Sequence, residues 1–147
     1  MFFLDTNVLV YLRDAGSPDK SRVATKLVDE LSGVGEAVVS IQVLSEFFWV
    51  VTRKLRQPLP MADAVTEVAR FQNMFRVISM SAEVLNLALD ILTAHQLTLW
   101  DAQIVAAASL SGASVVLTED MQSQPIIHGV RYANPFEDGF DWRLLPT

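Results

Sequence analysis

Short β-branched runs alternate with longer segments of helical spacing along this chain of 147 residues. The expected strands are residues 2–4, 37–40, 76–78, 114–117 and 129–132. The expected helices are residues 20–32, 41–56, 61–74, 81–95 and 99–111. Continuous apolar runs such as Val115-Val116-Leu117 suit strands that are covered on both faces, as in parallel sheets. The alternation therefore predicts an α/β layered domain with a mainly parallel sheet.

The size and composition fit a single domain over residues 1–147 and exclude several classes of protein. Apolar residues make up 51% of the chain and charged residues 19%, a globular composition. No apolar run approaches the roughly 18 residues of a membrane span, and the N-terminus lacks the basic part of a secretion signal, so we expect a cytoplasmic protein. The absence of cysteine excludes thiolate metal sites and cysteine nucleophiles. The net charge of −6 argues against a broad basic surface for nucleic acid.

Four acidic residues lie in unusually apolar parts of the sequence: Asp5, Glu46, Asp101 and Asp120. Carboxylates in apolar surroundings are costly unless a cation, a metal or hydrogen-bond donors compensate them. The chain has few cations to do this, with 11 Lys and Arg against 17 Asp and Glu. These four residues are therefore the candidates for a functional site.

Three of the four acids also have an ordinary structural interpretation. Asp5 could cap the helical turn that follows it, and Asp101, three residues after Thr98, fits an N-terminal capping box. Asp120 could belong to a solvated loop. Glu46 is different, because its neighbours one helical turn away are mostly apolar, so a partner or a metal is the better explanation for it.

The topology predicts that the four acids converge. Open parallel sheets bind ligands beyond the carboxyl ends of their strands. Asp5 ends the first expected strand, and Asp120 lies just after the strand 114–117. Glu46 and Asp101 fall near the starts of two expected helices, which would face the same edge of the sheet.

A cluster of carboxylates would either raise pKa values or bind divalent cations. Carboxylate oxygens suit Mg²⁺ or Mn²⁺, and two such ions about 3.5–4 Å apart can hold the attacking and leaving oxygens of a phosphodiester displacement. Histidine is not needed. We therefore interpret His95 as a helix C-terminal residue and His128 as a loop residue rather than as ligands.

The motifs around these acids resemble those of the PIN domain, and more narrowly those of VapC-type toxin ribonucleases of bacterial toxin–antitoxin systems. The resemblance rests on Phe3-Leu4-Asp5-Thr6-Asn7, Ser45-Glu46-Phe47, Leu99-Trp100-Asp101-Ala102-Gln103-Ile104-Val105-Ala106-Ala107-Ala108, Leu117-Thr118-Glu119-Asp120 and the ending Gly129-Val130-Arg131-Tyr132-Ala133-Asn134-Pro135-Phe136. It spans nearly the whole chain. The first motif alone is weak, whereas four motifs in this order are strong.

The resemblance implies a three-layer α/β/α sandwich and an acidic metal site. It implies that Mg²⁺ or Mn²⁺ is held by Asp5, Glu46, Asp101 and Asp120. Asn7 and Thr118 match positions that support the site by hydrogen bonding. Glu119 is the ambiguous acid, but the Thr-x-Asp spacing of the family favours Asp120 over it.

The resemblance also implies an activity and partners. It implies a metal-dependent endoribonuclease that hydrolyses RNA, forms a homodimer and is silenced by a cognate VapB-like antitoxin. A solitary PIN-domain RNA-processing nuclease, a catalytically inactive PIN-like binding module and a nuclease of DNA remain alternatives. A phospho-acceptor domain fits poorly, because it would need a late lysine and the only lysines are Lys20, Lys26 and Lys54.

The sequence indicates less clearly which residues would bind the substrate. Arg53, Lys54 and Arg56 either contact phosphates or favour the dipole at a helix C-terminus. Basic residues of the segment 20–32 are interpreted as a solvated face: Lys20, Arg22 and Lys26. The apolar run around Glu46 either packs within the domain or faces another chain.

Overall fold

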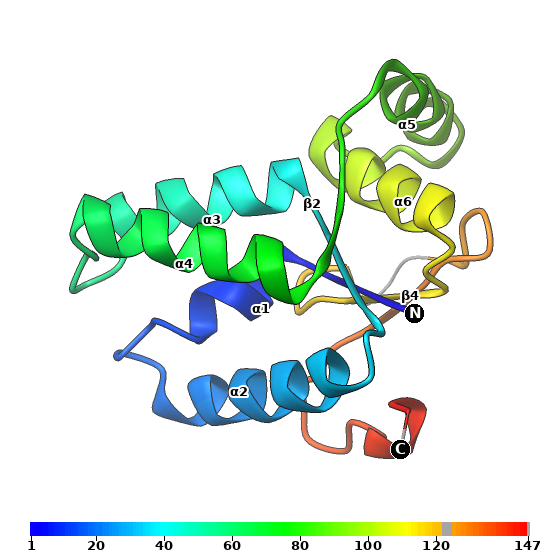
Figure 1. Cartoon of the computed structure of the whole chain (residues 1–147). Helices are drawn as coiled ribbons and strands as arrows, with labels where there is room; N and C mark the ends of the chain where they lie inside the picture. Colours follow the sequence, from blue (N-terminus) through cyan, green and yellow to red (C-terminus); the bar gives the residue numbers. More distant parts are fainter. Residues whose placement is uncertain (122–124, 147) are drawn as a thin grey trace.

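Five short strands form one parallel sheet in the computed structural model, which describes residues 1–121 and 125–146 (Figure 1). The strands are β1 (Phe2–Leu4), β2 (Ala37–Ser40), β3 (Arg76–Ile78), β4 (Val115–Leu117) and β5 (Arg131–Ala133), in the order β3-β2-β1-β4-β5. Every pair of neighbours is parallel. β1 is the central strand, so the residues that follow it lie in the middle of the carboxyl edge.

Helices cover both faces of this sheet, which confirms the α/β/α arrangement. They are α1 (Thr6–Tyr11), α2 (Pro18–Gly33), α3 (Ile41–Arg53), α4 (Met61–Met74), α5 (Ala82–His95) and α6 (Leu99–Ser111), followed by a short 3₁₀ turn at Trp142–Leu144. Figure 1 shows α2 and the C-terminal segment on one side of the sheet, and α5 and α6 on the other. α3 packs beside α4 and against α1, and α5 packs on α6. No helix in the described part of the chain is long and apolar enough to cross a membrane.

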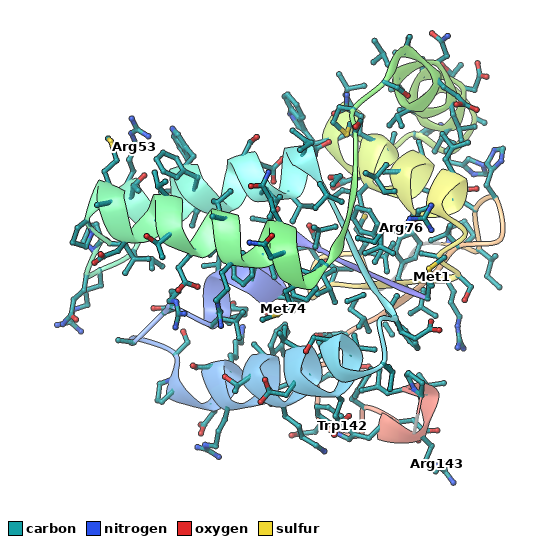
Figure 2. The ribbon with its side chains drawn as sticks, viewed as in Figure 1. Met1, Arg53, Met74, Arg76, Trp142 and Arg143 are labelled. Carbon is teal, nitrogen blue, oxygen red and sulfur yellow. The ribbon has the colours of Figure 1, made fainter. Side chains whose placement is uncertain are left out.

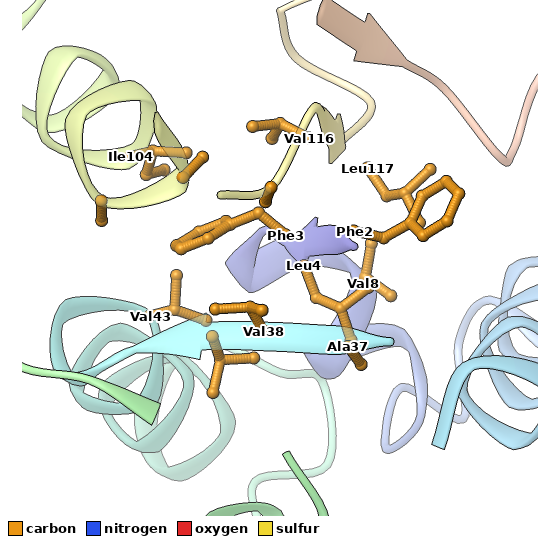
Figure 3. Packing of buried hydrophobic residues seen from close by; sticks show 14 of the residues in the cluster. Phe2, Phe3, Leu4, Val8, Ala37, Val38, Val43, Ile104, Val116 and Leu117 are labelled. Carbon is orange, nitrogen blue, oxygen red and sulfur yellow. The ribbon is translucent and has the colours of Figure 1, made fainter. Parts of the chain in front are cut away.

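The core explains why the strands are apolar on both faces. Four side chains of the sheet are fully buried: Phe3, Leu4, Val38 and Leu117. Buried side chains of α3 and α6 pack beside them (Figure 3). Burial of a large apolar side chain contributes roughly 1.5–3 kcal/mol. The same packing fixes the direction in which β1 and β4 leave the sheet.

The apolar helix around Glu46 is buried mainly within its own domain. Phe47 and Val51 of α3 are fully buried, and the Phe47 ring meets the Phe71 ring of α4 edge to face at 5.1 Å between centroids. Trp49 is the exception, with 46% of its surface exposed.

Two predicted boundaries near the candidate site are wrong. The helix predicted over 41–56 ends at Arg53, so Arg56 lies in the turn beyond it. The last strand, predicted over 129–132, is shifted to 131–133, because His128 and Gly129 adopt positive φ values of 48° and 78° and make a tight turn before it. The other strands and helices lie within about two residues of their predicted ends.

Candidate active site

The carboxyl end of β1 opens into a pocket of about 390 Å³, which we call the acid pocket. Its lining contains five carboxylate side chains: Asp5, Asp14, Glu46, Asp101 and Asp120. No lysine, arginine or histidine lines it among the residues that the structure describes. The four acids singled out in the sequence therefore surround one space, together with Asp14, which sequence reasoning missed.

Asp5 is the most buried of these acids. It caps α1, since Oδ1 accepts from the backbone N–H of Thr6 at 2.6 Å, which confirms the capping interpretation. Oδ2 accepts from the Thr118 hydroxyl at 2.7 Å. Burial raises the pKa of Asp5 to about 6; the Thr118 and Thr6 hydrogen bonds oppose the rise, and the charges of Asp120 and Glu46 add to it.

Asn7 connects the end of β1 to the loop after β4. Its Nδ2 donates to Asp5 Oδ2 at 3.4 Å, to Thr118 Oγ1 at 3.2 Å and to Asp120 Oδ2 at 3.1 Å. The Asp120 backbone N–H also donates to Thr118 Oγ1, at 3.1 Å. The side-chain oxygen of Asn7 is buried and has no donor among the described residues. Asn7 and Thr118 thus hold two of the carboxylates in place.

Glu46 is held by two residues that sequence reasoning did not single out. The Thr6 hydroxyl donates to Oε2, and Gln42 Nε2 donates to Oε1, both at 3.0 Å. Gln42 also reaches the backbone carbonyl of Trp100 at 3.4 Å, which links α3 to the start of α6. The Gln42 side-chain oxygen is buried without a donor in the described chain. The spacing of Gln42, one helical turn before Glu46, was the available signal.

Asp101 bonds to the N-cap residue of its own helix while it lines the acid pocket. Its backbone N–H donates to Thr98 Oγ1 at 3.1 Å, which confirms the Thr98 half of the predicted capping box. Its Oδ2 accepts from the Thr98 hydroxyl at 2.8 Å, instead of from a backbone N–H as a complete capping box would have it. Asp101 also acts on β5, where burial and then the charge of Asp101 raise the pKa of Tyr132 to about 12. The bond to Thr98 and exposure to the pocket therefore coexist in this residue.

The side chains that line the acid pocket carry the type of oxygen atom that a hard divalent cation prefers. Carboxylates dominate, no side-chain cation lines the pocket, and two buried amide oxygens, on Asn7 and Gln42, face no donor in the described residues. The side chains are not yet arranged around one point: in residues 1–121 and 125–146, no three acidic or histidine side chains form a group that could hold a metal. Asp101 is turned to Thr98 and Glu46 to Thr6 and Gln42, so a bound cation would require these carboxylates to rotate.

The two neighbouring acids after β4 lie in different surroundings. Asp120 lines the pocket, whereas Glu119 accepts from the Tyr11 hydroxyl and from Lys20 Nζ, the latter at 2.6 Å. Lys20 Nζ also donates to the Tyr11 hydroxyl at 2.9 Å. This placement favours Asp120 as the acid that faces the pocket.

The interpretation of the basic face of α2 as solvated fits Arg22 and Lys26, which are exposed, but not Lys20, which has an ion-pair partner in another part of the fold. Lys20 is engaged with Glu119, which raises the pKa of the Lys20 ammonium. Lys26 Nζ lies 3.7 Å from the centroid of the Trp142 ring. Arg22 is solvated as expected, with a partner on its own helix.

Three cations lie at the end of α3 and in the turn beyond it. Arg53, Lys54 and Arg56 are exposed, and none of the three has an acidic partner in the part of the chain described. Figure 2 shows Arg53 at the outer end of α3. Arg56 lines a small neighbouring pocket together with Asp14, which also lines the acid pocket. Arg53 is in the last turn of α3, as the dipole interpretation requires, but Arg56 lies past the helix.

The histidines lie where the sequence placed them. His95 is the last residue of α5, and His128 is in the turn before β5. Neither lines the acid pocket.

Comparison with known proteins identifies the fold. The family model described as the PIN domain matches residues 2–124. No curated protein sequence matches this chain.

Several solved structures are similar to this chain in fold. VapC20 of Mycobacterium tuberculosis, described as a sarcin–ricin loop cleaving toxin, has 19% identity and a TM-score of 0.62 over 87% of this chain and 98% of its own. VapBC2 of Rickettsia felis, bound to a promoter DNA fragment, has 18% identity and a TM-score of 0.66 over 90% and 97%. FitAcB of Neisseria gonorrhoeae has 20% identity and a TM-score of 0.66 over 92% and 99%. Since the family model covers most of the chain, including all four candidate acids, this protein belongs to the PIN domain family.

Proposed function

We propose that this protein is an Mg²⁺- or Mn²⁺-dependent endoribonuclease and acts as the VapC-type toxin of a toxin–antitoxin pair. The acid pocket carries the proposal, because five carboxylates without a lining cation at the carboxyl edge of a parallel sheet are suited to divalent metal and phosphodiester chemistry. Among the similar structures, one is described as a sarcin–ricin loop cleaving toxin and another as a toxin–antitoxin complex.

The proposed ligands are Asp5, Glu46, Asp101 and Asp120. A divalent cation bound there would supply charge neutralisation and a more acidic bound water. The surrounding residues of the chain orient these ligands: Thr118 and Asn7 fix Asp5 and Asp120, while Thr6 and Gln42 fix Glu46. Glu46 is partly exposed to the pocket and is placed to orient a water molecule there.

The raised pKa of Asp5 is consistent with this assignment. With a pKa of about 6, Asp5 is mostly ionised at pH 7 but pays for the charge through burial and repulsion. A cation in the pocket would relieve both effects and return the pKa toward lower values. Metal binding should therefore release protons below about pH 6, where the free carboxyl is mostly protonated and the metal-bound one is not.

Cleavage of RNA by the purified chain tests the proposal directly. We expect Mg²⁺ or Mn²⁺ to support cleavage of a mixed RNA substrate, and EDTA to abolish it. Asp5→Asn and Asp101→Asn should each reduce cleavage by at least about 100-fold, since each removes a charged ligand. Asp90→Asn, an exposed position on α5, is the matched control and should retain full activity.

The other outcomes distinguish the alternatives. Cleavage that persists in EDTA, or full activity in both pocket variants, would contradict the metal mechanism. Cleavage of a DNA oligonucleotide of the same sequence but not of RNA would identify a DNA nuclease. Metal binding by calorimetry without any cleavage would identify a PIN-like binding module.

We propose that Arg53, Lys54 and Arg56 contact the phosphates of the RNA. All three are exposed and have no acidic partner in the described chain, and Arg56 lines a small pocket that shares Asp14 with the acid pocket. Replacing the three by glutamine should weaken RNA binding and flatten its salt dependence, because fewer counterions are released. Asp101→Asn should leave this salt dependence unchanged.

The toxin assignment needs a partner, and we propose a VapB-like antitoxin together with a homodimer of this chain. One structure similar to this one is described as a toxin–antitoxin complex. A small open reading frame directly upstream should encode the antitoxin, and its product should co-purify with this chain and block cleavage. Its absence would favour a solitary RNA-processing nuclease. Light scattering of the purified chain would test the homodimer.

A further inference from the structure

Two of the three tryptophans of this chain are largely exposed. One lines the acid pocket, and the other lies on α3, the helix that carries Glu46. Trp100 is 62% exposed and lines the pocket next to Asp101. Trp49 is 46% exposed and lies on α3 one turn after Glu46. The third, Trp142, packs within the chain, against Phe140 at 5.2 Å between ring centroids and under Lys26. The two most exposed tryptophans are thus Trp100, beside Asp101, and Trp49, on the helix of Glu46.

The backbone around Trp100 is anchored although its ring is free. Its carbonyl accepts from Gln42, the residue that also holds Glu46. Thr98 caps the same helix two residues earlier. The indole ring is therefore presented from a fixed position rather than from a mobile loop.

Trp49 lies on α3 between Glu46, which lines the acid pocket, and Arg53. Glu46, Trp49 and Arg53 follow one another at helical spacings of three and four residues, which places them along one side of α3. Lys54 Nζ lies 4.5 Å from the centroid of the Trp49 ring. An aromatic face and positive charge are thus adjacent on the surface that leads into the pocket.

Charge alone cannot hold an RNA strand at this site. The acid pocket has five carboxylates in its lining, and the chain as a whole carries a net charge of −6. Stacking of a base on an aromatic ring involves no net charge and works for any unpaired base. It requires bases that are free of a duplex, because bases inside a helix are already stacked on one another.

We propose that Trp100 and Trp49 form a stacking site for unpaired bases of the RNA, with Trp100 at the wall of the acid pocket and Trp49 farther along α3. This proposal rests on the proposed ribonuclease function for the identity of the strand. Arg53, Lys54 and Arg56 then contact the phosphates next to the base on Trp49. Discrimination between single strands and duplex comes from the two rings rather than from the carboxylates.

Binding to a labelled 12-nucleotide oligoadenylate and to a 12-base-pair RNA duplex, measured by fluorescence anisotropy in EDTA to prevent cleavage, tests the proposal. Trp100→Ala and Trp49→Ala should each weaken single-strand binding about 5- to 150-fold and change duplex binding little. Phenylalanine at either position should restore most of the affinity, since it keeps a stacking face. Trp142→Phe is the control and should bind like the unmodified chain.

Tryptophan fluorescence gives a readout that does not depend on activity. Oligoadenylate should quench the emission of the unmodified chain and of Trp142→Phe. Quenching should fall in Trp100→Phe and in Trp49→Phe, and vanish when both are replaced. Melting temperatures of the four variants close to that of the unmodified chain would confirm that they are folded.

The outcomes separate this inference from the proposed function. Cleavage of RNA in Mg²⁺ together with unchanged binding by the alanine variants would overturn the stacking site and leave the nuclease intact. Binding and quenching without cleavage would support the stacking site and contradict the nuclease. Unchanged quenching, or a dimer that both alanine variants dissociate, would overturn the inference by showing that the rings are covered by protein.

Discussion

Replacement of Asp5 by asparagine should stabilise the folded protein while it abolishes activity. The pKa of Asp5 is about 6 in the folded chain against 3.8 for an ordinary aspartate. The folded state therefore binds the proton more tightly than the unfolded state, so stability present below pH 3.8 is lost as the pH rises through about 6. A rise of about two pKa units corresponds to about 3 kcal/mol at about 1.4 kcal/mol per unit.

Asparagine removes this cost without removing the cap. Asparagine and aspartate are about equally good at helix N-caps, so the bond from the Thr6 backbone N–H can be kept. The amide also avoids the repulsion from Asp120 and Glu46 that adds to the pKa shift. The gain should be about 0.5 kcal/mol at pH 4 and should approach about 3 kcal/mol above pH 7.

Urea unfolding in EDTA at several pH values between 4 and 8 measures this difference. Asp90→Asn, at an exposed position of α5, provides the control and should show no such dependence. Excess Mn²⁺ should then stabilise the unmodified chain by about 2.7 kcal/mol at 100 times its Kd, and stabilise Asp5→Asn much less. Asp5→Asn that is less stable than the unmodified chain at pH 8, or a difference that is constant with pH, would refute the reasoning.

Three further changes test other parts of the structure. Thr118→Val removes the hydroxyl that donates to Asp5, so the pKa of Asp5 should rise further, which carboxyl NMR titration would detect. Thr98→Ala should cost about 1 kcal/mol in urea unfolding through the lost cap of α6, and Thr98→Ser should cost much less. Phe71→Ala should cost about 3–5 kcal/mol, because the ring is fully buried between Phe47 and Phe75; a cost below 1 kcal/mol would contradict the packing.

Local signals in the sequence were sufficient for most of the fold. Strands such as Val115–Leu117 are apolar on both faces because helices cover both faces of the sheet. α6 is bounded by Thr98 and Gly112. Threonine is a common N-cap residue and glycine readily adopts the left-handed backbone of a helix end, so both boundaries could be predicted from the residue types. The end of α3 was harder. The chain leaves the helix at Arg53 and turns back so that the Leu59 backbone N–H donates to the Val51 carbonyl at 2.8 Å, a closure that no local pattern specifies.

Part of the candidate site could likewise be predicted from the local sequence, and part of it could not. Asp5, Glu46, Asp101 and Asp120 could be predicted, because each carboxylate conflicts with its apolar neighbours. The contact of Lys20 with Glu119 could not, since the two residues are 99 positions apart and each alone is ordinary for a solvent-exposed surface.

The bond between Asp101 and the N-cap residue of its helix is compatible with metal binding. Asp101 accepts from the Thr98 hydroxyl through Oδ2, and its side chain lies on the wall of the pocket. The bond to Thr98 keeps the carboxylate at the wall of the pocket, so a rotation of this one side chain is what a cation would require of it. The helix N-terminus also favours the charged form of the acid. A hydrogen bond to the N-cap residue is therefore no argument against a role for Asp101 as a ligand.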